Sequence, residues 1–205
     1  ADALKHANAA ASSRHGGVLA LAGDDHGCQS STLAHQSEHI LKACCIPVLN
    51  PANVQDYLDF GLHGYAMSRY SGCWIGFKCV TDVVESGASV IVDPERVQVK
   101  LPADFAMPQG GLNIRWPDGI LEQEARILDY KVYAALAYCR ANSLDRIVWD
   151  SPRARFGIVT TGKGVTIHTI DCETLESFAE TPERWLDVAW DQDPNSTEQH
   201  VGRLS

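Results

Sequence analysis

The feature that most constrains this chain is an alternation of short apolar runs with amphipathic segments between residues 17 and 80. The apolar runs are GVLALAG (17–23), IPVLNP (46–51) and CWIGFKCV (73–80). Continuous runs of this length are typical of strands buried on both faces, as in a parallel sheet. The segments 37–45 and 53–72 carry apolar residues at helical spacing, and Asn53 is a suitable N-cap. The sequence therefore predicts a βαβαβ unit with right-handed crossovers.

The pattern changes after residue 88. Residues 104–119 are rich in Pro and Gly, which predicts irregular structure. Residues 121–144 carry the strongest helical pattern of the chain, with acidic residues early and basic residues later, as the helix dipole favours. The run FGIVTTG (156–162) opens what we expect to be a new α/β unit. Residues 164–205 hold nine acidic and two basic residues without a sustained period.

Composition excludes several classes of protein. The net charge of −9 argues against nonspecific binding to nucleic acid or anionic lipid. No stretch approaches the roughly 20 apolar residues of a membrane helix. The start is polar and lacks Met, which suggests a piece of a longer reading frame without an export signal. The seven cysteines form no C-x-x-C pair, so we expect reduced thiols in a cytoplasmic protein.

Two histidines four residues apart, in HQSEH (35–39), match the H-x-x-E-H pattern of one class of zinc metalloprotease. That chemistry needs both histidines on one helix face, a third ligand downstream and a free glutamate as base. His35 lies close behind a polar loop, where a helix is expected only to begin, and no third-ligand motif follows. We therefore expect His35 to face a cleft and His39 to lie on the helix surface, without zinc.

Two other motifs resemble phosphate sites only in part. GDD (23–25), followed by Asn50, resembles the G-D-G…N pattern that holds magnesium and a diphosphate, but Asp25 stands where backbone must approach the phosphates. The loop that follows has no Lys or Arg to offset the charge. TTGKG (160–164) lacks the Ser or Thr that completes a phosphate-binding loop. Neither motif predicts a diphosphate site.

A polar loop, DDHGCQSSTLAHQ (24–36), follows the first apolar run. In a parallel sheet, ligands bind at the carboxyl ends of the strands, so this loop is placed where a binding site is expected. One interpretation is a hydrogen-bonding wall for an organic substrate or cofactor. The alternative is an ordinary solvated loop, because loops are polar in general.

Long segments of the chain are similar to one enzyme family. HANAAASSRHGGVLALAGDDHGCQSSTLAHQSEH, IPVLNPANVQDYLDFGLHGYAMSRYSGCWIGFKCV, GGLNIRWPD and LDRIVWDSPRARFGIVTTGK closely resemble the large bacterial indolepyruvate ferredoxin oxidoreductases, which are thiamine-diphosphate-dependent 2-oxoacid:ferredoxin oxidoreductases. The resemblance runs from about residue 3 to Lys163, and residues 164–205 do not look like the family's continuation.

The resemblance implies a fragment of an enzyme that converts an aryl 2-oxoacid and coenzyme A to an acyl-CoA and carbon dioxide. Two electrons would pass to ferredoxin. The intact enzyme would use thiamine diphosphate, Mg²⁺ and [4Fe-4S] clusters. The activating glutamate would lie before Ala1 and the magnesium motif and cluster cysteines after the chain's end. The fragment alone would hold no cofactor or metal and would be inactive.

The resemblance also implies the domain organisation and the partners. Residues 1–90 would be the second half of a pyrimidine-type thiamine-diphosphate-binding domain, 91–150 a connector, 151–163 the start of the next α/β domain and 164–205 an acidic tail. The partners would be the remainder of the enzyme or its partner subunit and ferredoxin, in a homo-oligomer when intact. The catalytic residues are unknown. Near the cofactor and substrate we expect Asp25, His26, Ser30, Ser31 and His35.

Two other functions stay open. The chain could be a non-catalytic binding or assembly module that keeps the α/β sheet, which the absent cofactor motifs and the acidic tail favour. It could also be a zinc hydrolase that uses HQSEH, although the spacing argues against it.

Overall fold

The computed structural model describes residues 1–116 and 118–147 and the backbone of two further strands, β4 (Ile158–Thr160) and β5 (Val165–Ile167). The chain divides into two compact units, residues 1–145 and 146–205. In the second unit, β4 and β5 pair antiparallel. Of the run FGIVTTG (156–162), the structure describes only residues 158–160, which form β4. All other elements belong to the first unit.

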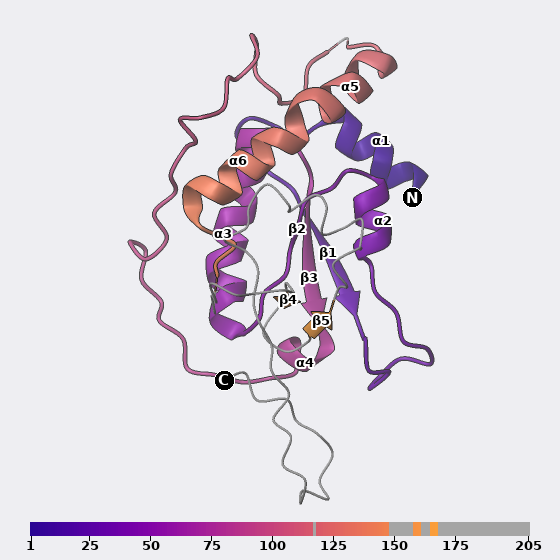
Figure 1. The fold of residues 1–205 in the computed structure, drawn as a ribbon, viewed down its shortest axis with the longest axis vertical. Helices are drawn as coiled ribbons and strands as arrows, with labels where there is room; N and C mark the ends of the chain where they lie inside the picture. The colour runs from indigo at the N-terminus through magenta and orange to yellow at the C-terminus, as the bar shows by residue number, and fades with distance from the viewer. Residues whose placement is uncertain (117, 148–157, 161–164, 168–205) are drawn as a thin grey trace, which may run out of the picture. The chain divides into compact units, whose positions relative to one another are not determined.

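A parallel sheet of three strands lies at the centre of the first unit (Figure 1). Its strands are β1 (Leu19–Asp24), β2 (Val48–Leu49) and β3 (Ile75–Val80). β2 and β3 lie within the second and third apolar runs of the sequence, and β1 extends one residue past the first run, to Asp24. The strand order is β1-β3-β2, so β3 is central. In the register, Leu19 is paired with Ile75 and Val48 with Gly76.

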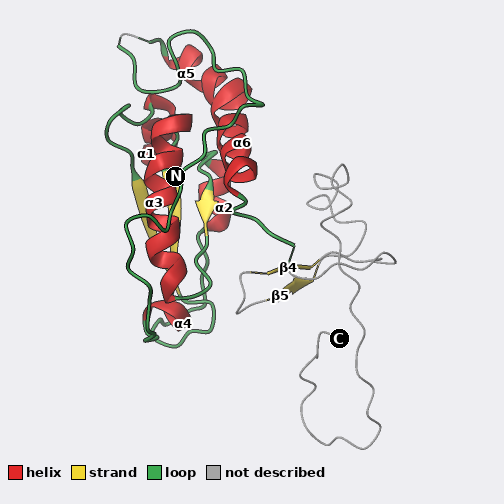
Figure 2. Ribbon diagram, turned by 90° about the vertical axis from the view of Figure 1, so that its left-hand side faces the viewer, coloured by secondary structure: helices red, strands yellow, loops and turns green. Residues whose placement is uncertain are grey.

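Helices cover both faces of this sheet. α1 (Asp2–Ala10) and α2 (Glu38–Ala43) pack on one face, and α3 (Val54–Ser71) and α6 (Val132–Asn142) pack on the other. Figure 2 shows α3 in front of the strands. The larger core, on the α3 side, comprises Leu49, Met67, Cys73, Ile75, Phe77, Ala135 and Tyr138. The smaller core, beneath α1 and α2, comprises Leu41, Cys44 and Ile46.

The bounds of α3 follow from its end residues. The Asn53 side chain accepts a hydrogen bond from the Asp56 amide, which is the N-cap interaction that the sequence predicts. Gly72 ends the helix in the left-handed conformation, with φ of 73°. A Cβ at this position would lie 2.0 Å from the Leu112 carbonyl oxygen, so only glycine allows this close approach.

The second half of the unit consists of a long loop and a helical segment. β3 leads into the short α4 (Thr81–Val84), after which residues 85–116 contain no helix or strand. A continuous helical segment then forms from α5 (Ile120–Arg126), a π-helical turn η1 (Ile127–Lys131) and α6. It lies within the predicted helix 121–144 except for its first residue, Ile120, but the π-helical turn was not expected from the sequence.

α1 is tied to the rest of the unit by one buried amide and one buried lysine. The Asn8 side chain donates to the Cys44 and Cys45 carbonyls and accepts from the Trp74 amide. Lys131 donates to the carbonyls of Asn8 and Ala9, in the last turn of α1, at 3.2 and 3.0 Å. Its positive charge therefore faces the negative end of the α1 dipole.

In the part of the chain that the structure describes, no helix combines the length and the apolar character needed to cross a lipid bilayer. The assignment of residues 1–90 to a pyrimidine-type domain and the expected divisions at 91–150, 151–163 and 164–205 stay predictions.

Lys131 gives the first unit an unusual pH dependence. Burial lowers the pKa of Lys131 to about 8, from 10.5. Between these two values the unfolded chain binds more protons than the folded one, so the free energy of unfolding should rise with pH in this window, by about 3 kcal/mol. Urea unfolding of the wild type and of Lys131→Met at several pH values tests this. The contribution of Lys131 is the difference between the free energies of unfolding of the two proteins at each pH.

The comparison with Lys131→Met is needed because a second buried group, the Cys73 thiol, changes the free energy of unfolding in the opposite direction as pH rises. Burial raises the pKa of Cys73 to about 11, which makes the fold lose stability as pH rises above about 9 in both proteins. A stability difference between wild type and Lys131→Met that stays constant from pH 7 to about 10 would contradict the assignment.

Candidate functional site

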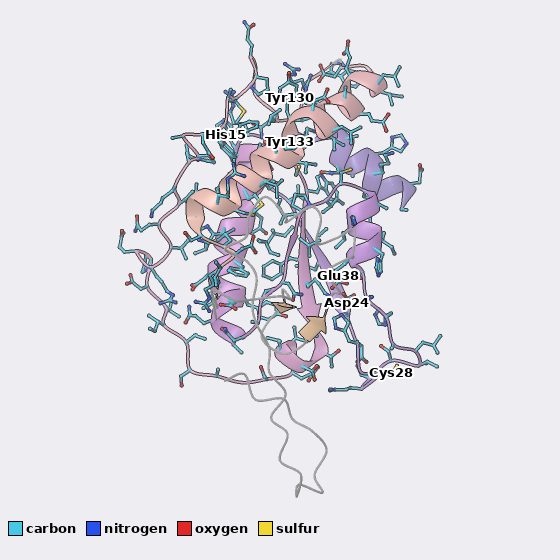
Figure 3. All side chains as sticks on the ribbon, viewed as in Figure 1. His15, Asp24, Cys28, Glu38, Tyr130 and Tyr133 are labelled. Carbon is cyan, nitrogen blue, oxygen red and sulfur yellow. The ribbon has the colours of Figure 1, made fainter. Side chains whose placement is uncertain are left out.

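A buried lysine stands at the carboxyl end of the sheet, between acidic groups from two other segments. Lys78 lies on β3, and its side chain is fully buried. Asp24, at the end of β1, is buried as well, and Glu38 begins α2. Figure 3 shows Asp24 and Glu38 close together at this end of the strands. The crossovers of a parallel sheet bring these three residues to one place.

The Lys78 ammonium donates to three acceptors. It lies 3.0 Å from Asp24 Oδ2 and 3.0 Å from His26 Nε2, and it also bonds Glu38 Oε1. The ring of His26 thus faces the Lys78 ammonium through its Nε2 atom. One ammonium thus offsets the charge of one of the two carboxylates.

Asp24 also fixes the start of α2. Its Oδ1 accepts from the Ser37 hydroxyl at 2.5 Å, and its Oδ2 accepts from the Ser37 amide at 3.0 Å. Burial by itself raises the pKa of Asp24, but the hydrogen bonds from Ser37 and the charge of Lys78 outweigh it and leave the pKa below its ordinary value. The carboxylate is therefore ionised at neutral pH.

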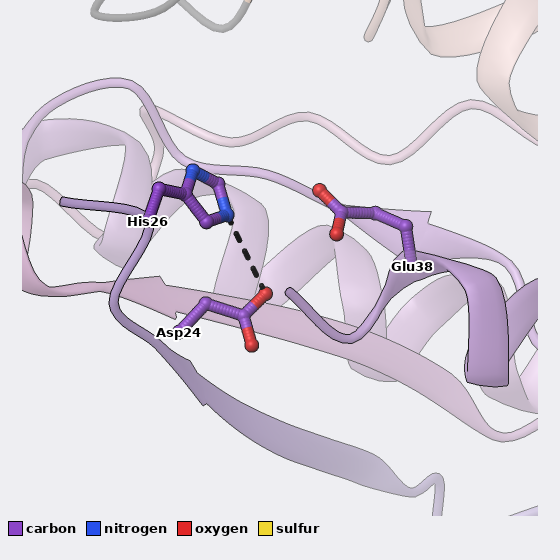
Figure 4. A group of neighbouring side chains, drawn as sticks. All are labelled: Asp24, His26 and Glu38. Carbon is purple, nitrogen blue, oxygen red and sulfur yellow. Dashed lines mark ion pairs between the residues drawn. The ribbon is translucent and has the colours of Figure 1, made fainter. Parts of the chain in front are cut away.

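Three of these side chains have the composition of a metal site. Asp24, His26 and Glu38 each offer one ligand atom, and the three atoms lie within 4.8 Å of one another (Figure 4). Lys78 is hydrogen-bonded to all three, so its ammonium already provides the positive charge that a cation would supply. A divalent ion would have to displace Lys78, and the geometry therefore favours a closed ion-pair cluster over a metal centre.

Asp25 organises the polar loop that follows β1. Its carboxylate accepts from the amides of Gln29, Ser30 and Ser31 at 2.8 to 2.9 Å. The hydrogen bonds from the Ser30 and Gln29 amides lower the pKa of Asp25 to about 2. The side chain of Asp25 therefore stabilises the turn that contains its neighbours.

His35 closes the other end of the same loop. Its Nε2 lies 3.1 Å from the Gly23 carbonyl oxygen and its Nδ1 lies 3.3 Å from the Leu33 carbonyl oxygen. Its amide donates to the Asp25 carbonyl, in an isolated antiparallel bridge. The two carbonyls favour the charged imidazolium and raise the pKa of His35, the Gly23 carbonyl most strongly.

The structure places the five predicted site residues in two groups. Asp25 is brought together with Ser30 and Ser31, and through its backbone with His35. His26 points the other way, toward Lys78 and Asp24. Their role as ligand-binding residues stays a prediction.

HQSEH does not have the geometry of the metalloprotease pattern. α2 begins at Glu38, so His35 precedes the helix and shares no helix face with His39. Both ring nitrogens of His35 face carbonyl oxygens. His39 Nε2 lies 3.2 Å from Nε2 of the Gln36 side chain.

The sequence reasoning missed Lys78, and it took the charge of the two adjacent acids as uncompensated. The compensating cation comes from the neighbouring strand, not from the loop. The signal was available: IGFKCV is apolar except for its lysine, and a lysine in a strand buried on both faces requires an acidic partner.

A shallow pocket of about 280 Å³ lies elsewhere in the first unit, against α5 and η1. Its two arginines, Arg115 and Arg126, both pair with Asp118, at 3.4 and 2.6 Å. Glu122 and Asp129 add negative charge to its wall. The pocket therefore offers no excess positive charge to an anionic ligand, and the cluster around Lys78 is the better-defined polar site.

Comparison with known proteins gives matches to part of the chain. Residues 154–191 match the family described as the RelA/SpoT RIS domain. Among curated proteins, GTP pyrophosphokinase rsh of Brucella ovis and that of Brucella abortus are each 41% identical over 49 residues, which is 24% of this chain and 6% of the relative. GTP pyrophosphokinase of Myxococcus xanthus is 51% identical over 35 residues, 17% of this chain and 4% of the relative. No solved structure matches.

These matches overturn the oxidoreductase assignment. The related proteins are GTP pyrophosphokinases, so the expectation of a thiamine-diphosphate-dependent enzyme acting on aryl 2-oxoacids was wrong. The expected cofactors, thiamine diphosphate, Mg²⁺ and [4Fe-4S] clusters, were therefore also wrong. The same holds for the expected partners, which were ferredoxin, coenzyme A and the oxidoreductase's partner subunit. Residues 164–205, which did not fit the oxidoreductase family, overlap the region that matches.

Removing the buried ammonium should destabilise the first unit strongly. Lys78→Met leaves the Asp24 carboxylate buried without its cation, so the free energy of unfolding should fall by about 3–5 kcal/mol in urea denaturation. Lys42→Met, on the exposed side of α2, is the matched control and should change stability by less than about 0.5 kcal/mol. A loss below about 1 kcal/mol in Lys78→Met would show that the cluster is not an ion-pair network.

Asp25→Ala should loosen the loop after β1. The folded pKa of Asp25, about 2, lies below its unfolded value of 3.8, so the carboxylate stabilises the fold above pH 3.8 and this contribution is lost as pH falls through about 2. At neutral pH, amide hydrogen exchange at residues 29–31 should be faster in Asp25→Ala than in the wild type. Asp2→Ala, an exposed carboxylate on α1, should leave these rates unchanged.

Proposed function

We propose that this chain is a non-catalytic binding and assembly module of the RelA/SpoT type. The observation that carries the proposal is the match of residues 154–191 to the RelA/SpoT RIS domain. We infer that this segment associates with a GTP pyrophosphokinase and regulates it, while the first unit supports the segment as a scaffold. The chain spans only 6% of the length of its Brucella relatives, so the pyrophosphokinase activity is assigned to the partner.

The polar site of the first unit supports a scaffold role. A general base or nucleophile has to be free to accept or give up a proton near neutral pH. Asp24 and Lys78 are bonded to one another, and the carboxylate of Asp25 is bonded to three amides of its own loop. These groups stabilise the carboxyl end of the sheet.

We also propose a cytoplasmic location. The cysteines of the described residues are free thiols, among them the exposed Cys28 near the tip of the polar loop (Figure 3). Exposed free thiols persist where the compartment is reducing.

The proposal is tested by adding the full chain to a purified GTP pyrophosphokinase, that of Brucella abortus. We expect a stable complex in calorimetry and a change in the enzyme's rate of roughly fivefold or more, as is typical of regulatory coupling. The chain alone should show no GTP pyrophosphokinase activity.

The matched control is a chain in which residues 154–191 are permuted, so that composition and charge are kept but the similarity is lost. The helical circular dichroism of residues 1–145 reports whether the first unit still folds. An equal effect of the permuted and natural chains would refute the role of the segment. Pyrophosphokinase activity of the chain by itself would refute a non-catalytic module.

A further inference from the structure

β1 is an edge strand whose outer side has no partner among the described strands. The Val18 carbonyl accepts from the Ile75 amide, and Leu19 is paired with Ile75. In a parallel sheet, the backbone amide and carbonyl of alternate residues face the adjacent strand. Because the Val18 carbonyl faces β3, the backbone amides and carbonyls of Leu19 and Leu21 point away from β3. These amides and carbonyls are therefore available to another strand.

The two edges of the sheet differ in how they are protected. Pro47 immediately precedes β2 and Pro51 follows shortly after it, and β2 itself is only two residues long. Proline and short length are the devices by which proteins protect edge strands from pairing. Residues 16–23, GGVLALAG, contain neither proline nor charge. The edge at β1 is thus left open for pairing, whereas the edge at β2 is protected.

Exposed apolar side chains lie on the same side of the unit as this edge. Leu21 is 71% exposed, although it stands in the middle of a strand. On α3, Leu58, Leu62 and Tyr65 are also exposed and fall on one stripe of the helix. Tyr65 lies against Gly17, just before β1. The two residues are so close that a Cβ on Gly17 would be 2.9 Å from the Tyr65 carbonyl oxygen. The stripe therefore continues the apolar surface of the strand.

We propose that β1 pairs antiparallel with β1 of a second copy of this chain, which joins the two sheets across a two-fold axis. Leu19 of one copy lies opposite Leu21 of the other, so that the outward amides and carbonyls of both residues are satisfied in both copies. Leu19 and Leu21 point to the same face of the sheet, so each exposed Leu21 is covered by Leu19 of the other copy.

Local structure sets the limits of this pairing. Pairing ends at Gly23, because its carbonyl already accepts from His35, and at Gly17, whose φ of 99° leaves the extended conformation. A second copy placed against β2 would meet the proline-flanked edge instead.

The size of a stable interface indicates that α3 takes part. A specific dimer buries roughly 800 Å² on each partner, more than a five-residue strand edge supplies. The exposed side chains of Leu58, Leu62 and Tyr65 are needed to reach this area. The inference does not depend on the proposed regulatory role, because it rests on the first unit alone.

Sedimentation equilibrium of the full chain, from about 1 µM to about 1 mM, tests the proposal. We expect the mass to rise from 22.4 kDa to twice this value. Leu21→Lys places a charge opposite the other strand and should raise the dissociation constant at least about tenfold. Leu101→Lys is the matched control, because Leu101 is 68% exposed in a loop, and it should dimerise like the wild type.

Amide hydrogen exchange distinguishes this dimer from any other. In the wild type, exchange at the Leu19 and Leu21 amides should slow as concentration rises, and in Leu21→Lys the amide of residue 19 should stay fast. A wild-type chain that is monomeric at every concentration would overturn the proposal. So would a dimer in which these amides exchange at a concentration-independent rate, or a Leu21→Lys chain that dimerises as the wild type does.

Discussion

A single buried ammonium holds the carboxyl end of this sheet together. Lys78 is fully buried on the central strand, and it reaches the end of β1 through Asp24 and the start of α2 through Glu38. Burying a charge is costly unless it is paired, so the strand can hold its lysine only when both neighbouring segments are in place. The interaction therefore selects one arrangement of β1, α2 and β3 among the alternatives that an apolar core alone would allow.

This way of building the sheet end separates stability from recognition. Asp24 is bonded to Lys78 and Ser37, and Asp25 is bonded to the amides of its own loop, so the most polar stretch of the first unit is closed on itself. The similarity to known proteins lies in another part of the chain, residues 154–191. The two observations agree with a chain in which one unit provides a scaffold and the other provides the contact with a partner.

Local patterns in the sequence were sufficient for much of the first unit. The three apolar runs contain β2, β3 and all of β1 except Asp24, and Asn53 caps α3 as expected, because strand burial and capping depend on residues close in sequence. The cluster around Lys78 could not be read in the same way, since its acids lie 54 and 40 residues earlier and meet it only through the crossovers. The π-helical turn within 127–131 also has no signal in the apolar pattern.

The functional assignment failed for a different reason. It extended a family's cofactors to a loop on the strength of overall likeness, although no residue of that loop had been shown to hold a diphosphate. A polar loop at the carboxyl end of a strand is placed for ligand binding, but its side chains can equally be used to fix the loop itself. Asp25 and His35 have that arrangement in the structure.

The contacts of the first twelve residues bear on the order in which this protein folds. The Ser12 amide donates to Gly72, and the Ser12 carbonyl accepts from Ile114, so one residue joins segments about sixty and one hundred positions away. The bond from Lys131 to Asn8 spans 123 residues. Asn8 can reach Cys44, Cys45 and Trp74 once β3 has formed, whereas the bonds to Ile114 and Lys131 need the second half of the unit. Residues 1–12 are therefore fixed in two stages, and without residue 131 the last carbonyls of α1 would lack the lysine that offsets their dipole.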